Sequence, residues 1–326
     1  MLVQSQYNEC KICGGRSHKL LFTAKDLNYG TTNKEFNIVK CKKCKLVHIN
    51  PLPVNLEQYY PELYGPHQQK DNISIKPSIE TVLSLFYNYP VQKSGGQGVL
   101  KKICYLHKFF EVAVKNEYFF HRIPYERQAK ILDIGCGNGS YLLLLKKLGW
   151  NAAGQLFGVE FPNESIAHIK KTEELNIIEG NFLNVELPMS FFSIATLRHV
   201  LEHFSDPVLA MRRVHDVLAP GGRVLISLPN FRSLETFLFK GKWYHIDAPR
   251  HLYHFTPATL KALLERTGFE MERIYLKKSV STVTRSLENY GLTVSKSVEK
   301  YIISNILKIS KLLGLSEEIL CIAVKK

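Results

Sequence analysis

The sequence predicts an α/β protein built on a doubly wound, mostly parallel sheet. Across residues 130–279, short apolar runs alternate with amphipathic stretches, which is the pattern of consecutive βα units. The clearest unit is a buried strand at Lys130–Ile134, followed by a glycine-rich turn and a helix over Tyr141–Leu148. The chain has 326 residues, 45% of them hydrophobic, so it can hold this domain and a smaller module.

The remaining elements follow from caps and from apolar runs. Asp206 before Pro207 and Thr256 before Pro257 are typical helix starts, and Gly268 is a typical helix end. Further strands are predicted at Phe157–Glu160, Phe191–Leu197, Arg223–Leu228 and Phe269–Leu276.

Three regions are expected along the chain: a cysteine-containing module at 1–60, a linker and helical segment at 61–129, and the βα domain at 130–326. The linker contains the glycine-rich break Ser94–Gly98 and an aromatic, helix-like stretch at Leu100–His121. A helical insertion is expected at about 280–317, before a last strand at Ile319–Val324. The insertion holds a basic amphipathic helix, Val298–Leu313, which can pack on its own domain or make peripheral contact with an anionic membrane.

Charge and cysteine usage indicate the partners and the compartment. The 43 lysines and arginines exceed the 29 acidic residues by 14, which favours phosphate-bearing ligands, nucleic acid or an anionic membrane surface. The N-terminus has no apolar leader, and no run of 18 apolar residues occurs. Seven cysteines without an export signal favour metal binding over disulfides, so we expect a cytoplasmic protein.

Four of these cysteines form two pairs with metal-ligand spacing. Cys10 and Cys13, and Cys41 and Cys44, are each separated by two residues. Such knuckles can place four sulfurs about 2.3 Å from one tetrahedral Zn²⁺. Because no coordination position would stay open, the site is expected to be a structural zinc ribbon.

The glycine-rich turn at 131–140, ILDIGCGNGS, places backbone N–H groups where a polar ligand can approach a helix start. Gly135, Gly137 and Gly139 are spaced G-x-G-x-G after an acidic Asp133. A dinucleotide fingerprint would need glycine at position 140, where Ser140 stands.

This turn, together with LAPGGRVLISLPN at 218–230, resembles class I S-adenosylmethionine-dependent methyltransferases. The resemblance implies a seven-stranded, Rossmann-like methyltransferase fold in which the glycines make room for the methionine part of S-adenosyl-L-methionine and Asp133 orients its amino group. Glu160, at the end of the second strand, would bind the ribose hydroxyls. The family often has aspartate where this chain has Asn181, whose amide oxygen can also accept a hydrogen bond from the adenine amine. The predicted cofactor site further includes Cys136, Phe182 and Leu197.

Two histidine-rich segments follow strands of the predicted sheet. His199 and His203 lie in RHVLEH, which matches an inverted zinc-protease motif but lacks a third ligand and follows a strand. Ligands of open α/β sheets bind outside the carboxyl ends of the strands, so these histidines are candidate catalytic residues. The alternative is that His199 caps a turn and His203 packs under the sheet.

The second segment, WYHIDAPRHLYHF at 243–255, is similar to a segment of the sugar C-methyltransferases, whose catalytic histidine corresponds to His251. Their glutamate and tyrosine are Arg250 and Ala248 here, so keto-sugar enolisation is not implied. Arg250 could bind an anionic acceptor or pair with Asp247. The cysteine segment VKCKKCKLVHINPLP at 39–53 also resembles methyltransferases of sugar and polysaccharide pathways.

The sequence therefore predicts methyl transfer to a sugar or glycan-pathway acceptor, nucleotide- or lipid-linked, and O-methylation with a histidine general base is the favoured reaction. The C-terminal domain of the sugar C-methyltransferases does not fit in this length, which favours an O- or N-linked or a different carbon acceptor. Two alternatives stay open: an RNA-directed methyltransferase that uses the ribbon and the basic surface, and a cofactor-binding scaffold without catalysis.

Overall fold

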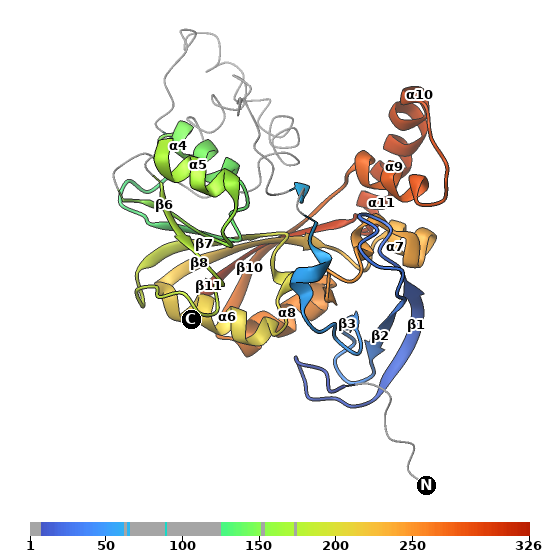
Figure 1. Cartoon of the computed structure of the whole chain (residues 1–326), viewed down its shortest axis with the longest axis horizontal. Coiled ribbons are helices and arrows are strands. Elements are labelled where there is room, and N and C mark those ends of the chain that lie inside the picture. The colour runs from blue at the N-terminus through green and yellow to red at the C-terminus, as the bar shows by residue number, and fades with distance from the viewer. Residues whose placement is uncertain (1–7, 62–63, 66–88, 90–124, 151–153, 173–174) are drawn as a thin grey trace. The chain divides into compact units, whose positions relative to one another are not determined.

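The computed structural model describes residues 8–61, 64–65, 89, 125–150, 154–172 and 175–326 (Figure 1). The chain forms two compact units, one of residues 1–64, 197–216 and 226–326, the other of 65–196 and 217–225. This grouping differs from the expected division at residues 60 and 130, because the N-terminal module belongs with the C-terminal half of the chain. The predicted break at Ser94–Gly98 and the aromatic stretch at Leu100–His121 lie outside the described residues.

A seven-stranded sheet contains the βα units in the strand order β10-β11-β8-β7-β4-β5-β6. The pairs β4–β5 and β5–β6 are parallel, and β10–β11 is antiparallel. When the seven strands are numbered 1 to 7 in chain order, the sheet has the Rossmann order 3-2-1-4-5-6, with strand 7 (β11) inserted between strands 5 (β8) and 6 (β10). The strands are β4 (Ile131–Ile134), β5 (Leu156–Glu160), β6 (Asn176–Glu179), β7 (Phe192–Arg198), β8 (Leu218–Pro229), β10 (Phe269–Lys277) and β11 (Glu318–Lys325).

The helices between the strands begin and end at residues with clear capping chemistry. The carboxylate of Asp206 accepts hydrogen bonds from two N–H groups of the first turn of α6. Thr256 and Thr259 form a reciprocal capping box at α8, with proline at the first helical position. These helices are α4 (Ser140–Lys147), α5 (Glu164–Thr172), α6 (Pro207–Val217), α7 (Leu234–Phe239) and α8 (Pro257–Arg266).

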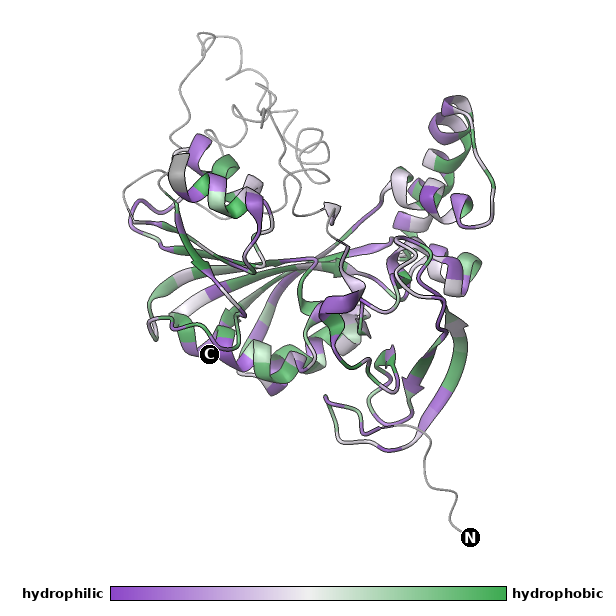
Figure 2. Ribbon diagram, viewed as in Figure 1, coloured by the Kyte–Doolittle hydropathy of each residue, from purple (hydrophilic) through white to green (hydrophobic). Residues whose placement is uncertain are grey.

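The sheet strands are largely apolar, whereas the helices carry polar residues as well (Figure 2). All four residues of β4 are buried, as expected for a strand covered on both faces. β8 begins at Leu218 rather than at the predicted Arg223, and so includes the Pro220–Gly222 segment.

A second sheet of four antiparallel strands combines the N-terminal module with a segment far along the chain. Its order is β1-β2-β3-β9, and β3 pairs with β9 through Val47 opposite His254. Ile38 and Ile49 of this sheet pack in one apolar cluster with Trp243 and Ile246. The N-terminal module therefore shares its core with residues 239–254. The strands are β1 (His18–Ala24), β2 (Phe36–Cys41), β3 (Val47–Ile49) and β9 (Tyr253–His254).

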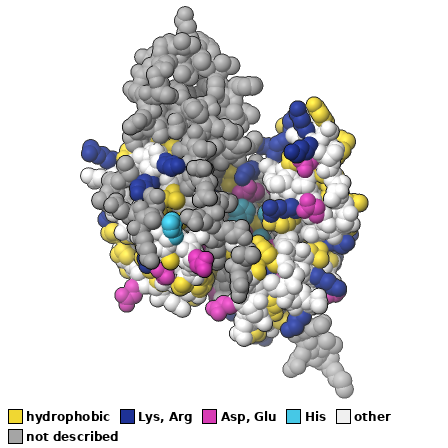
Figure 3. Space-filling model, turned by 45° about the horizontal axis from the view of Figure 1, so that its top comes forward, with side chains coloured by type: hydrophobic (Ala, Val, Ile, Leu, Met, Phe, Trp, Pro, Cys, Tyr) yellow, Lys and Arg dark blue, Asp and Glu magenta, His cyan; other side chains and the backbone are white. Residues whose placement is uncertain are grey.

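Helices occupy the position of the expected insertion, between β10 and β11. Ile303 and Leu307 are buried, but Ile306 and Ile309 are 46% and 59% exposed. Figure 3 shows hydrophobic side chains interleaved with lysine and arginine over this insertion. No helix within the described residues is long and apolar enough to cross a membrane. The elements are α9 (Val280–Glu288), α10 (Lys296–Val298), a π-helical turn (Glu299–Ile303) and α11 (Ser304–Leu312).

Glu317 is a buried acid beside the start of β11, and its ionisation should control stability. Burial, followed by the nearby charge of Glu235, raises its pKa from 4.5 to about 9. The folded state therefore keeps this carboxyl protonated at pH values where the unfolded chain ionises. Stability is then lost as the pH rises from about 4.5 to about 9, because the unfolded state binds fewer protons in that range.

We expect the Glu317→Gln variant to gain stability relative to the wild type as the pH rises. Thermal unfolding between pH 4 and pH 8.5 measures this as a difference in Tm that grows with pH. Glu270→Gln, at a glutamate whose side chain is 61% exposed, is the matched control and should show no such growth. Parallel stability curves for wild type and Glu317→Gln would contradict the assignment.

Candidate functional site

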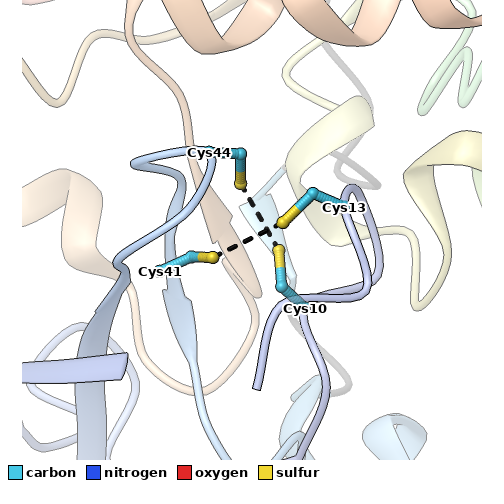
Figure 4. A group of neighbouring side chains, drawn as sticks. All are labelled: Cys10, Cys13, Cys41 and Cys44. Atoms are coloured by element: carbon cyan, nitrogen blue, oxygen red, sulfur yellow. Dashed lines mark hydrogen bonds between the residues drawn. The ribbon is translucent and has the colours of Figure 1, made fainter. Parts of the chain in front are cut away.

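The four paired cysteines come together in one cluster, with their sulfurs pointing toward a common centre (Figure 4). The Sγ atoms of Cys10 and Cys44 are 3.6 Å apart, and those of Cys13 and Cys41 are 3.5 Å apart. A tetrahedron of sulfurs about 2.3 Å from Zn²⁺ has edges of about 3.8 Å, so the spacing fits this ion.

The two knuckles are built by the same turn. Gly14 and Lys45, each directly after the second cysteine of a pair, have φ of 67° and 66°. Each donates its backbone N–H to the carbonyl of the first cysteine, at 2.8 Å and 3.0 Å. A Cβ on Gly15 would lie 3.1 Å and 3.2 Å from two of the sulfurs, so the backbone is packed tightly around the cluster. These residues fit a structural zinc ion, and an ion there would tie the loop before β1 to the end of β2.

The glycine-rich turn follows β4 and leads into α4, as predicted. Gly135, Gly137 and Gly139 all have positive φ, between 58° and 69°. A Cβ on Gly139 would come within 2.7 Å of Ile169, so a larger residue would be both strained and crowded. The preceding Asp133 is buried, and its carboxylate accepts a 2.5 Å hydrogen bond from Thr196.

Glu160 ends β5 and reaches back to the glycine-rich turn. Its carboxylate accepts hydrogen bonds from the N–H of Gly137 at 2.7 Å and of Phe161 at 2.8 Å. The acid and the turn therefore form one preorganised unit at the carboxyl ends of β4 and β5, where open α/β sheets bind their ligands.

The other predicted cofactor residues differ in how accessible they are. The side-chain oxygen of Asn181 accepts a hydrogen bond from the N–H of Leu183, and Phe182 is buried. Cys136 is buried within the turn, where desolvation raises the pKa of its thiol. Leu197 is fully buried in β7 and exposes neither its side chain nor its backbone.

The structure brings the two histidine segments together. The rings of His203 and His251 meet edge to face with centroids 4.7 Å apart, and His245 stacks on His251 at 6.3 Å. His251 donates from Nδ1 to the carbonyl of His245 at 2.8 Å, and His203 has Nδ1 3.1 Å from the carbonyl of Arg250. Because a carbonyl only accepts, each ring in its neutral form carries its proton on Nδ1 and leaves Nε2 with a free lone pair.

Acidic residues surround this group of imidazoles. His199 lies between two carboxylates, 3.2 Å from Glu318 and 3.5 Å from Glu202. Burial acts to lower the pKa of His199, but the two acids outweigh it and raise the pKa to about 10. Burial and then the nearby His251 lower the pKa of His203 to about 4. The site thus combines a protonated histidine with a neutral one.

Arg250 is not available to bind an acceptor, and of its two predicted roles the structure shows the pairing with Asp247. The side chain is fully buried, and its NH2 group binds Asp26 at 2.6 Å and Asp247 at 2.7 Å. NH1 donates to the carbonyl of Tyr59 at 2.9 Å. Burial raises the pKa of Asp26, but Arg250 and Thr31 outweigh that effect and lower it to about 2.

Sequence analysis missed the residues that support these histidines. Glu202, in the middle of the quoted RHVLEH motif, is 1% exposed and lies 3.9 Å from Nε2 of His251. Tyr60 places its hydroxyl 3.0 Å from Nδ1 of His203. Asp26 had no sequence signal at all, because its partner lies 224 positions away.

Comparison with known proteins identifies the class. Residues 107–274, just over half of the chain, match the model of a family described as a methyltransferase domain, and the chain belongs to this family. It is 28% identical over 167 residues to a Mycolicibacterium smegmatis protein named as an S-adenosylmethionine-dependent methyltransferase, covering 48% of this chain and 62% of that protein.

A ubiquinone biosynthesis O-methyltransferase of Pseudomonas aeruginosa is 31% identical over 157 residues, covering 44% of this chain and 66% of that enzyme. The chain thus spans less than two thirds of the length of these two curated relatives. The crystal structure of an Archaeoglobus fulgidus S-adenosylmethionine-dependent methyltransferase superposes with a TM-score of 0.46 at 23% identity, covering 67% of this chain and 99% of that one.

We expect the purified protein to retain about one zinc ion per chain after dialysis against a mild chelator, since four thiolates bind zinc tightly. Cys41→Ser should lose this zinc and lower the Tm, because one ligand to the ion is removed. Elemental analysis and thermal unfolding measure both effects, with Cys321→Ala, at a buried cysteine outside the cluster, as the control. A folded wild-type protein without zinc would contradict the assignment.

Asp26→Asn should destabilise the protein by about 3 kcal/mol, since breaking this buried ion pair leaves Asp247 as the one carboxylate bound to Arg250 among the described residues. Denaturant unfolding measures the loss. Asp216→Asn removes a carboxylate that is 54% exposed and should change stability by less than about 0.5 kcal/mol. Equal stability of the two variants would show that Arg250 does not depend on Asp26.

Proposed function

We propose that this protein transfers the methyl group of S-adenosyl-L-methionine to a hydroxyl of a small acceptor from a sugar or glycan pathway. The observation that carries the proposal is the pair of a half-buried His203 and a buried His251, whose Nδ1 atoms face backbone carbonyls and leave both Nε2 lone pairs free. A hydroxyl acceptor needs a group that takes its proton, and imidazole is the usual one near neutral pH.

The residues around the glycine-rich turn fit the cofactor. Glu160 offers a carboxylate to ribose hydroxyls, and the glycines, at positive φ and without side chains, let a ligand approach the backbone of the turn that this carboxylate holds. When bound there, the cofactor supplies an electrophilic methyl group. The chain has to orient the acceptor in line with that group and to remove its proton.

His251 is our candidate for the base. Its Nδ1–H is fixed by the carbonyl of His245, so the proton of the acceptor goes to Nε2. Glu202 and Asp247 each place a carboxylate oxygen 3.9 Å from that nitrogen. These charges would stabilise the imidazolium as it forms, in the way a buried acid supports a catalytic histidine.

The class of the acceptor is inferred from sequence resemblance. The cysteine segment and the sequence around His251 resemble sugar-pathway methyltransferases, and the Pseudomonas relative is named as an O-methyltransferase. Since Arg250 is already paired, an anionic acceptor is favoured only by the net charge of +14.

Glu160→Ala should weaken cofactor binding about tenfold or more, because it removes the carboxylate that faces the turn and the ribose hydroxyls. Calorimetric titration with S-adenosyl-L-methionine measures this. Glu186→Ala, at an exposed glutamate of the same unit, should bind the cofactor as the wild type does. Unchanged affinity in a folded Glu160→Ala variant would argue against the proposed cofactor site.

His251→Ala should lower turnover by about 10²–10⁴-fold, the usual contribution of a general base, with cofactor affinity unchanged. An acceptor screen with isotopically labelled cofactor supplies the assay. Normal turnover in this variant with a loss in His203→Ala would move the role to His203. If neither substitution matters, the reaction proceeds without a histidine base.

A further inference from the structure

The group of imidazoles contains a carboxylate that lacks a hydrogen-bond partner. Both carboxylate oxygens of Glu202 are buried, and neither has a hydrogen bond from any described residue. Their nearest nitrogen neighbours are Nδ1 of His199 at 3.5 Å and Nε2 of His251 at 3.9 Å, which are ion-pair distances. A buried carboxylate without hydrogen bonds is costly, and the protonated His199 comes no closer than 3.5 Å, so the Glu202 oxygens can still take a cation as a direct ligand.

Three ligand atoms converge at this carboxylate. One from each of Glu202, His203 and His251 lies within 4.8 Å of the others. Tetrahedral metal–ligand bonds of about 2.1 Å place ligand atoms about 3.4 Å apart, so side-chain movements of about 1 Å close the set around one ion.

The two histidines are also oriented as metal-binding histidines are. Each has its Nδ1 against a backbone carbonyl, 2.8 Å from that of His245 and 3.1 Å from that of Arg250. In metal sites this outer hydrogen bond fixes the tautomer and directs Nε2 toward the ion. Two imidazole nitrogens and one carboxylate oxygen form a donor set that binds Zn²⁺ with a coordination position left open.

We propose that Glu202, His203 and His251 bind a divalent transition-metal ion, of the Zn²⁺ or Co²⁺ type, separately from the four-cysteine cluster. The Nε2 lone pair of His251 can hold an acceptor's proton or a metal ion, but not both. The ion therefore inhibits methyl transfer, a consequence that rests on the proposed role of His251 as the base.

Cobalt titration tests the site without any assay of activity. Protein whose four-cysteine cluster is filled with zinc is dialysed and titrated with Co²⁺. We expect one further equivalent to bind with visible d–d absorption and no thiolate-to-cobalt charge-transfer band, since the new ligands are nitrogen and oxygen. Glu202→Gln and His203→Ala should each weaken this binding about tenfold or more, because each removes a ligand.

His168→Ala, at an exposed histidine on α5, is the matched control and should bind cobalt as the wild type does. The proposal fails if wild-type protein takes up no further equivalent, or if the binding persists in both folded ligand variants. Adding Zn²⁺ to the methyl-transfer assay then separates the two proposals. If cobalt binds but excess zinc leaves the methyl-transfer activity unchanged, the metal site is supported and the role of His251 as the base is refuted.

Discussion

Arg250 is the fully buried charge around which the histidine-bearing part of the molecule is arranged. Its guanidinium joins Asp26, from the segment after β1, to Asp247, four residues before His251. Removing this cation from water is costly, and only well-placed acids and carbonyls can compensate it. The loop that carries His245 and His251 is consequently fixed by the same contacts that hold the N-terminal segment against it.

The glycine-rich turn is held in a different way. There the turn is held by a carboxylate that binds the backbone, since Glu160 accepts hydrogen bonds from the N–H groups of Gly137 and Phe161. Neither Arg250 nor its acids take part. The candidate cofactor site and the candidate base are thus held by separate sets of contacts, so substitutions in one set can leave the other intact.

Local patterns predicted most of the sheet, because each βα unit is marked by an apolar run, a helix cap or a glycine within a few residues of sequence. The partners of Arg250 and the strand β9 were not predictable in this way. Asp26 acquires its role from a residue 224 positions away, and a strand of two residues has no periodicity to detect. The positions of His203 and His251 after strands of the sheet were predicted, whereas their orientation depends on carbonyls of His245 and Arg250 that no sequence pattern marks.

The cysteine cluster is connected to the candidate base through the four-stranded sheet. Cys41 ends β2, which pairs with β3, and β3 in turn pairs with β9 through His254, three residues after His251. An ion bound by the four sulfurs would restrain the end of β2 and hence the register of this sheet. β9 begins two residues after His251, so the backbone that orients Nε2 of His251 leads directly into a strand of this sheet. A metal ion held entirely by cysteines can therefore influence the geometry of the histidine site without contacting an acceptor.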